Sequence, residues 1–191
     1  MENDTAVTVK NAIEDILKDK DFALVAIDGR CASGKTTLSA ELKELLNCEV
    51  IHMDHFYPRL AQRTVARLSE PGGNLDRERV LEEVIAPIMR REEFSYRPYD
   101  PKVHDFSEPV KIKTNKIIIL EGSYSCHPEL FDFYDLRIFM TVGMEERLRR
   151  IKERNGEQGL MQFKELWIPK EELYFSTFDI EERCDLCFST E

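Results

Sequence analysis

The sequence predicts an α/β fold of three layers, in which helices cover both faces of a mostly parallel sheet. Continuous apolar runs of strand length recur along the chain, for example FALVAI and KIIIL. Such runs are typical of strands that are buried on both faces. Amphipathic helical stretches lie between them, and strands that alternate with helices form a parallel sheet with right-handed crossovers.

The N-terminal part of the chain supplies the first two strands. Apolar residues at helical spacing predict a short helix ahead of them, namely Val9, Ile13, Ile16 and Leu17. The first strand is Phe22–Ile27, and a glycine-bearing turn then leads into an amphipathic helix. Residues 49–53 form the second strand, which ends at Asp54. The polar stretch 58–74 ends in PGGN and predicts a loop with at most a short helix.

The second half of the chain begins with a helix that Asp76 can cap. Pro87 lies inside its apolar pattern and should kink or end it. Short extended pieces around the prolines of residues 94–113 predict a hairpin. The buried stripe of the capped helix consists of Val80, Leu81, Val84, Ile85 and Ile88. The later elements are the strands Lys116–Glu121, Leu136–Val142 and Cys184–Phe188 and a basic helix, Met144–Arg154.

Length and charge limit the classes of function. A chain of 191 residues fits one domain, residues 1–191. Its formal net charge is −10 at pH 7, and a chain this acidic should repel nucleic acids and anionic membranes. Any phosphate that it binds must sit in a local site, where backbone amides and a few cations outweigh the overall field. This favours a nucleotide pocket with a small-molecule partner over a nucleic-acid or membrane surface.

The five cysteines predict a reduced, cytoplasmic protein, because their odd number follows no disulfide framework. Cys184 and Cys187 form a lone C-x-x-C without the second Cys/His pair of a zinc site, so we interpret them as two half-buried thiols on a late strand. No stretch approaches the ~20 apolar residues of a membrane span, and the N-terminus has no signal-peptide pattern. Assembly into a homo-oligomer stays open.

Residues Gly29–Thr36, GRCASGKT, match the motif G-x-x-x-x-G-K-[ST] at every position. In this motif the backbone curls so that successive N–H groups point at phosphate oxygens. Lys35 reaches the β- and γ-phosphates, the Thr36 hydroxyl ligates Mg²⁺, and the positive end of the next helix lies under the anion. A P-loop NTPase fold that binds ATP and Mg²⁺ is therefore predicted. The nucleotide-binding residues would be Gly29, Ala32, Ser33, Gly34, Lys35, Thr36 and Thr37.

Three carboxylates follow predicted strands, and the functional groups of an open parallel sheet gather at the carboxyl ends of its strands. Glu121 ends an apolar strand in the Walker-B pattern and is the candidate Mg²⁺ partner, acting through water. Asp54 remains to accept the proton of an acceptor hydroxyl, and it could also contact the metal beside Thr36. Asp28 could act in the site, although bracing the P-loop backbone is the favoured interpretation.

A cationic stripe runs along the predicted helix Met144–Arg154. It consists of Arg147, Arg150 and Arg154, at i, i+3 and i+7. An apolar stripe lies beside it, which suits a lid over phosphates at about residues 147–165. A solvated basic face would show the same pattern. Further along, Trp167 and Tyr174 could stack on a base or pack in the core.

Several short motifs follow one another in a specific order. After the P-loop come Asp54-His55-Phe56-Tyr57, then Tyr99-Asp100 with His104 five residues past the tyrosine, then Glu121-Gly122. This set, from about residue 22 to residue 154, resembles the uridine kinase branch of the phosphoribulokinase/uridine kinase family of P-loop kinases. The chain departs from that pattern in segments 58–74 and 97–110, and its lid lacks the further arginines of uridine kinases.

The resemblance implies a role for each matching position. Asp54 would activate a sugar 5′-hydroxyl, and Asp76 would grip the ribose hydroxyls. Arg147 and Arg150 would draw in the acceptor and stabilise charge on the transferred phosphoryl group, and Arg154 continues their stripe toward the acceptor. The residues that would line the nucleoside pocket are Tyr57, Tyr99 and His104.

The expected function is ATP- and Mg²⁺-dependent transfer of the γ-phosphate to the 5′-hydroxyl of a nucleoside, with uridine or cytidine first. A second interpretation keeps the chemistry and changes the acceptor to another riboside, a sugar phosphate or a pantothenate-like alcohol. A regulatory GTPase or ATPase has less support, because no N-K-x-D guanine motif occurs. The choice between ATP and GTP as donor stays open. The residues expected to carry catalysis are Lys35, Asp54, Arg147 and Arg150.

Overall fold

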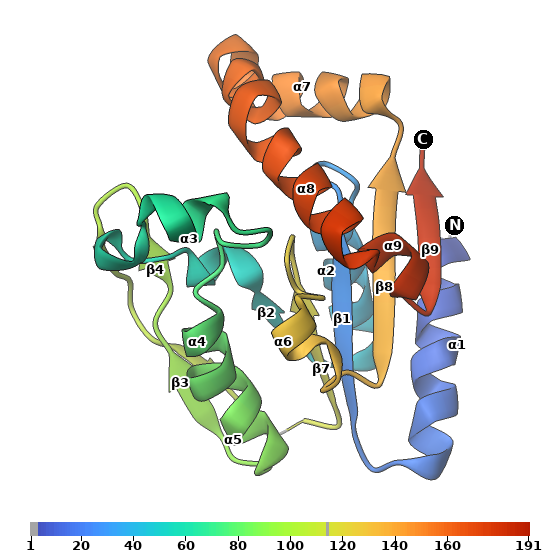
Figure 1. Cartoon of the computed structure of the whole chain (residues 1–191). Helices are drawn as coiled ribbons and strands as arrows, with labels where there is room; N and C mark the ends of the chain where they lie inside the picture. Colours follow the sequence, from blue (N-terminus) through green and yellow to red (C-terminus); the bar gives the residue numbers. More distant parts are fainter. Residues whose placement is uncertain (1–3, 114) are drawn as a thin grey trace.

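The centre of the fold is a parallel sheet of five strands in the order β2-β7-β1-β8-β9 (Figure 1). The computed structural model describes residues 4–113 and 115–191. Every pairing in this sheet is parallel, so the predicted α/β fold is confirmed. The strands are β1 Ala23–Gly29, β2 Glu49–His52, β7 Ile117–Glu121, β8 Leu136–Val142 and β9 Leu186–Thr190.

Two helices cover one face of the sheet. α1 Asp4–Asp19 and α2 Lys35–Leu46 pack against the side chains of β1, β7 and β8 that point toward them. Both helices are predicted from the sequence, and their apolar stripes are the buried ones. The helical residues that are almost completely shielded from solvent are Ala6, Val9, Ile13, Leu38 and Leu42.

The opposite face is covered by α6 Pro128–Phe131, α8 Ile168–Phe178, α9 Ile180–Arg183 and one helical run before the hairpin. That run consists of α4 Arg77–Arg79, the π-helical η3 Val80–Ile85 and α5 Ala86–Met89. Its widened turn precedes Pro87, which has no N–H to donate to the preceding turn. The run ends two residues after Pro87, as the proline predicts.

Residues 94–113 form the predicted hairpin, outside the main sheet. In it β3 Phe94–Tyr96 pairs antiparallel with β6 Val110–Ile112, and β4 Tyr99–Asp100 pairs antiparallel with β5 Asp105–Phe106. The predicted loop 58–74 holds only the 3₁₀ turn η2 Leu60–Gln62 and the short helix α3 Val65–Ser69. The hairpin and α3 stand together on the β2 side of the sheet (Figure 1).

The basic helix extends well beyond its predicted end at Arg154. α7 spans Met144–Gln162, and the π-helical η4 Phe163–Trp167 connects it to α8. Gly156 interrupts α7 with φ +71° and ψ −176°, a backbone conformation that is essentially restricted to glycine. The lid-like segment predicted at residues 147–165 therefore contains a break in its helix.

The interpretation of Cys184 and Cys187 as two half-buried strand thiols is only partly right. Cys187 is exposed on β9, and Cys184 precedes that strand. The strand begins later than predicted because Asp185 is held before it, where its carboxylate accepts a hydrogen bond from the backbone N–H of Arg137 at 2.7 Å. Within residues 4–113 and 115–191, no helix is both long and apolar enough to cross a membrane.

Candidate active site

The P-loop joins β1 to α2 and has the backbone geometry of a phosphate cradle. Gly29, Ala32 and Gly34 have φ values of 132°, 60° and 94°. A Cβ at Gly29 would lie 2.0 Å from the carbonyl oxygen of Met140 on β8, so only glycine fits there. The loop leads directly into the N-terminus of α2, where unpaired N–H groups favour an anion.

Lys35 places its ammonium group in the mouth of this loop. Its Nζ donates to the carbonyl oxygens of Gly29 at 2.6 Å and Arg30 at 2.9 Å. The side chain is buried, yet it lines the cavity described below. The ammonium is therefore held where it can bind phosphate oxygens.

Thr36 and Glu121 bring two oxygen-bearing groups together beside the P-loop. Thr36 Oγ1 lies 3.4 Å from each carboxylate oxygen of Glu121, which is buried at the end of β7. His52 Nδ1 contacts the same carboxylate at 2.5 Å, and this hydrogen bond raises the pKa of His52. Mg²⁺ usually takes one or two protein oxygens and completes its shell with phosphate and water. Thr36 and Glu121 fit that pattern. The described residues contain no group of three or more His, Cys, Asp or Glu side chains that could hold a metal ion.

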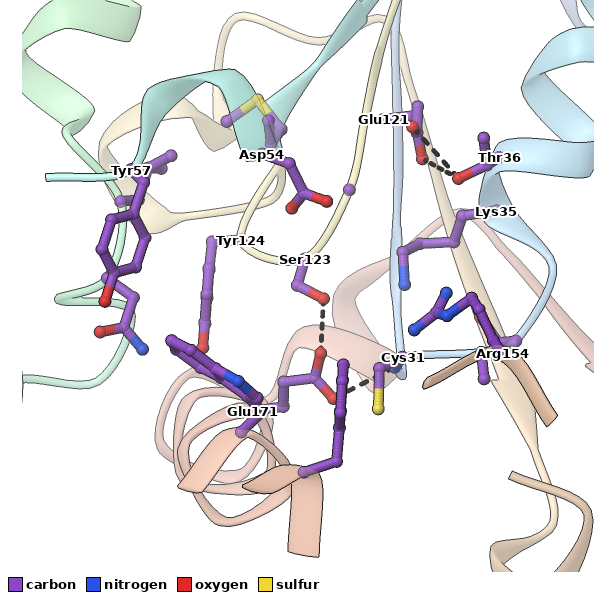
Figure 2. Close-up of a pocket in the computed structure, with 18 of the residues that line it drawn as sticks. Cys31, Lys35, Thr36, Asp54, Tyr57, Glu121, Ser123, Tyr124, Arg154 and Glu171 are labelled. Carbon is purple, nitrogen blue, oxygen red and sulfur yellow. Dashed lines mark hydrogen bonds between the residues drawn. The ribbon is translucent and has the colours of Figure 1, made fainter. Parts of the chain in front are cut away.

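Asp54 stands across the cavity from the P-loop, in the 3₁₀ turn η1 Met53–Phe56 that follows β2 (Figure 2). Its carboxylate is open to the cavity. Partial desolvation by the surrounding walls, and then the negative charge of Glu121, raise its pKa above the ordinary value of 3.8, while Lys35 and His52 act in the opposite direction. A carboxylate with a raised pKa in a cleft is suited to accept a proton from a hydroxyl.

These groups share one open cavity of about 1000 Å³, which is the size of a typical small-molecule site. Figure 2 shows Lys35 and Thr36 on one side, Tyr57 on the other and Asp54 between them. The predicted residues that line the cavity are Ala32, Ser33, Gly34, Lys35, Thr36, Thr37, Asp54, Tyr57, Glu121, Arg150 and Arg154. The P-loop residues and part of the residues predicted for the acceptor therefore line one cavity.

Among the predicted site residues, Gly29 and Asp76 lie outside the lining of this cavity. Gly29 forms the base of the P-loop, against β8. Asp76 is fully buried and caps α4 by accepting a hydrogen bond from the backbone N–H of Arg79 at 3.3 Å. Its second carboxylate oxygen lies 3.4 Å from Nε of Arg59. In this structure Asp76 serves the capping role that its sequence context also predicts.

Tyr99 and His104 also lie outside the cavity lining. Tyr99 is buried, with its ring edge-on to Phe106 at 5.5 Å between centroids. His104 is exposed in the turn between β4 and β5, with φ +58°. The sequence places both residues in one segment, but the short hairpin turns them to different surroundings.

Arg147 departs most from the predicted arrangement. Its guanidinium group is fully buried and donates to Glu171 at 2.6 Å and to Glu172 at 2.7 Å, and its Nε lies 3.2 Å from the sulfur of Cys31. This face of α7 packs on α8 and the P-loop, so Arg147 joins these three elements. Arg150, by contrast, lines the cavity and donates to the carbonyl oxygen of Ala32 at 3.1 Å.

Glu171, a buried acid in the cavity wall, was not predicted from the sequence. Its carboxylate accepts hydrogen bonds from the Cys31 backbone N–H at 3.1 Å and from the Ser123 hydroxyl at 2.7 Å (Figure 2). One signal was available, because Glu171 lies between Ile168 and Tyr174 at helical spacing, and an acid in an apolar stripe needs buried partners. Other cavity residues that were not predicted include Arg63, Asn74, Lys102, Ser123 and Tyr124.

Asp28 has the bracing role that the sequence analysis favours. It is fully buried, and its carboxylate accepts hydrogen bonds from the backbone N–H groups of Gly29 and Cys126 at 2.7 and 2.8 Å and from the hydroxyl of Tyr174 at 2.9 Å. Burial raises the pKa of Asp28 to about 6 despite these donors. Tyr174 therefore belongs to the core and does not stack on a ligand, whereas Trp167 lines the cavity.

Solved structures of other proteins share this overall fold. A possible uridine kinase from Bacillus stearothermophilus is 20% identical, with a TM-score of 0.65 over 95% of this chain and 99% of the other. YFH7 from Saccharomyces cerevisiae, described as a candidate P-loop containing kinase with a circular permutation, is 10% identical, with a TM-score of 0.70 over 97% and 99%. At these identities the likeness establishes the fold alone. Residues 25–172 match the AAA domain family, and the chain therefore belongs to this family of P-loop proteins.

Proposed function

We propose that this protein is a P-loop small-molecule kinase, which transfers the γ-phosphate of ATP to a hydroxyl group with the help of Mg²⁺. One observation carries the proposal: a single cavity connects the P-loop to the carboxylate of Asp54. An enzyme that only hydrolysed its nucleotide would not need a cavity that extends from the phosphate site to a carboxylate on another strand end. The kinase names of the two similar structures support the same class of reaction.

Catalysis of phosphoryl transfer consists mainly of positioning and charge neutralisation. Different residues would carry out each of these tasks. The P-loop amides and Lys35 would bind the donor phosphates. Thr36 and Glu121 would hold Mg²⁺, which when bound neutralises charge on the β- and γ-phosphates. Asp54 would orient the acceptor hydroxyl and take its proton, and Arg150 stands beside the P-loop to balance charge on the moving group.

The acceptor that the sequence resemblance suggests is the 5′-hydroxyl of uridine or cytidine. Aromatic side chains at the acceptor end support a planar ligand, because Tyr57 and Trp167 meet edge-on with ring centroids 6.1 Å apart in the cavity wall. The similarity to a possible uridine kinase supports the same class.

An ADP-release assay with ATP and Mg²⁺ tests this function. Uridine and cytidine are expected to raise the rate above the blank without acceptor. Equal rates with and without these nucleosides would reject the nucleoside assignment. ADP release with another hydroxyl compound would then retain the kinase and change its acceptor.

A second acceptor class has one observation in its favour. Besides Lys35, Arg150 and Arg154, the cavity lining contains the cations Arg63 and Lys102, and an uncharged nucleoside offers no anion to either. A sugar phosphate or a pantothenate-like alcohol carries an anionic group that these cations would bind. This class belongs in the same assay.

The pH dependence of turnover should report on Asp54. As a base, Asp54 must be unprotonated, so activity is present above its pKa and is lost as the pH falls through that value. Because the pKa is raised in the protein without ligand, we expect the acid limb of the kcat/KM profile to lie above 3.8, the ordinary value, and to disappear in Asp54→Asn. An acid limb at or below 3.8, or one that Asp54→Asn retains, would assign the titration to another group.

A further inference from the structure

The wall of the cavity beyond Asp54 carries two cations from the segments that depart from the uridine kinase pattern. Arg63 comes from segment 58–74 and Lys102 from segment 97–110, and both line the cavity. Arg63 packs on Tyr57, which Figure 2 shows on the side of Asp54 away from Lys35. Arg63 therefore belongs to the acceptor end, given the kinase function proposed above. It also contacts Tyr99 of the hairpin that carries Lys102.

Arg63 is held firmly by contacts other than an ion pair, and its Nη2 donates to the hydroxyl of Tyr99 at 3.5 Å. Its Nε donates to the carbonyl oxygen of Pro58 at 2.7 Å, and its guanidinium carbon lies 4.6 Å from the ring centroid of Tyr57 and 5.7 Å from that of Tyr99. In the described part of the chain it forms no ion pair with a carboxylate. A planar cation fixed by a carbonyl group and two rings is prepared to bind an anion through its remaining N–H groups.

Lys102 approaches the same end of the cavity from the turn between β4 and β5. Its backbone N–H donates to the carboxylate of Asp100 at 2.8 Å, which fixes the turn. Its side chain is exposed, and its ammonium group has no ion-pair partner among residues 4–113 and 115–191. Two separate segments thus bring cations without an ion-pair partner in the described chain to the lining of one cavity.

Two neighbouring arginines, by contrast, do have carboxylate partners. Arg59 pairs with Asp76, and Arg67 pairs with Glu78. The chain as a whole has an excess of acids, with a net charge of −10. In such a chain, two cations that line a cavity and meet no carboxylate are available to a ligand.

We propose that Arg63 and Lys102 select an acceptor that carries a negatively charged group, a phosphate monoester or a carboxylate, in addition to the hydroxyl that faces Asp54. The charged group would sit at the far end of the cavity, between the guanidinium and the ammonium groups. An unmodified nucleoside would leave both cations without a partner, so it would be a poorer acceptor than a charged molecule of similar size.

Matched pairs of acceptors test this selection in the ADP-release assay. The pairs are ribose 5-phosphate with ribose, uridine 3′-monophosphate with uridine, and pantothenate with its uncharged alcohol, panthenol. We expect a higher kcat/KM for the charged member of a pair. Arg63→Gln and Lys102→Gln should each lower that value by about 10- to 100-fold, the effect of losing one charge-assisted hydrogen bond, and should change the neutral member by less than about threefold.

Two variants control for the loss of a positive charge elsewhere. Arg90→Gln and Lys111→Gln alter exposed residues that do not line the cavity and should leave the preference unchanged. Arg63→Lys should recover part of the preference for charged acceptors that Arg63→Gln loses. Lys102 lies on an exposed turn, so Lys102→Gln keeps the test valid if Arg63→Gln folds poorly.

The possible outcomes separate the inference from the kinase function. A preference for ribose 5-phosphate assigns the charged group as phosphate, and a preference for pantothenate assigns it as carboxylate. Equal use of charged and neutral acceptors, or an equal loss for both in the variants, overturns the inference and leaves the kinase in place. Failure of every acceptor in a protein that still binds ATP removes the kinase function and the inference with it.

Discussion

Replacing Asp54 with asparagine is expected to lower kcat by about 10²–10⁴ while the affinity for ATP stays close to that of the wild type. The range is that for losing a general base. Asparagine keeps the size of the side chain and its ability to orient a hydroxyl, but it cannot take up the proton. Because Asp54 lies across the cavity from the P-loop, the donor phosphates lose none of the contacts described above.

Two measurements separate these effects. ADP release under saturating ATP and acceptor gives kcat, and titration with a fluorescent ATP analogue gives the nucleotide affinity. Asp132→Asn makes the same chemical change at an exposed position outside the cavity and should leave both values unchanged. Near-normal turnover in Asp54→Asn would remove Asp54 from the role of base.

Arg147→Ala is expected to destabilise the protein by about 3–5 kcal/mol, the cost of breaking a buried ion pair by removing one partner. The loss would leave Glu171 buried with its charge uncompensated, since Arg147 donates to it at 2.6 Å. It would also remove the hydrogen bond to Glu172 and the contact with Cys31 in the P-loop. α7, α8 and the P-loop would then lose the side chain that links them.

Urea denaturation gives this free energy, with Arg149→Ala as the matched control on the same helix. Arg149 is exposed and pairs with Glu146 and Glu153 at the surface, so its loss should shift the midpoint little. In a double-mutant cycle, adding Glu171→Gln to Arg147→Ala should cost less than Glu171→Gln alone, because Arg147→Ala has already broken the ion pair. Equal small shifts for Arg147→Ala and Arg149→Ala would show that the buried pair contributes no more than a surface one.

Features that depend on neighbouring residues in the sequence could be predicted. The apolar runs identify β1, β7 and β8, the P-loop motif fixes its own geometry, and Asp54 and Glu121 follow from strand ends that meet at one edge of a parallel sheet. Pro87 also ends its helix as expected. In each case a short stretch of chain carries enough information to determine its local structure.

Features that depend on contacts between distant segments could not be predicted in the same way. The stripe on α7 contains three arginines at equivalent spacing, and nothing in that spacing shows that Arg147 would be buried against Glu171 and Glu172. Arg63 and Lys102 belong to irregular segments, where no periodicity indicates which way a side chain points. The break at Gly156 likewise depends on how α7 must turn to reach α8.

The convergence of three segments on Asp28 bears on how the protein would move during a catalytic cycle. One carboxylate fastens the start of the P-loop, the loop after β7 and α8 to each other, so the phosphate cradle keeps its shape before a ligand arrives. Little conformational entropy is then lost from the loop on binding. We expect the motion of opening and closing to concentrate instead around Gly156, where the helix already lacks a regular backbone.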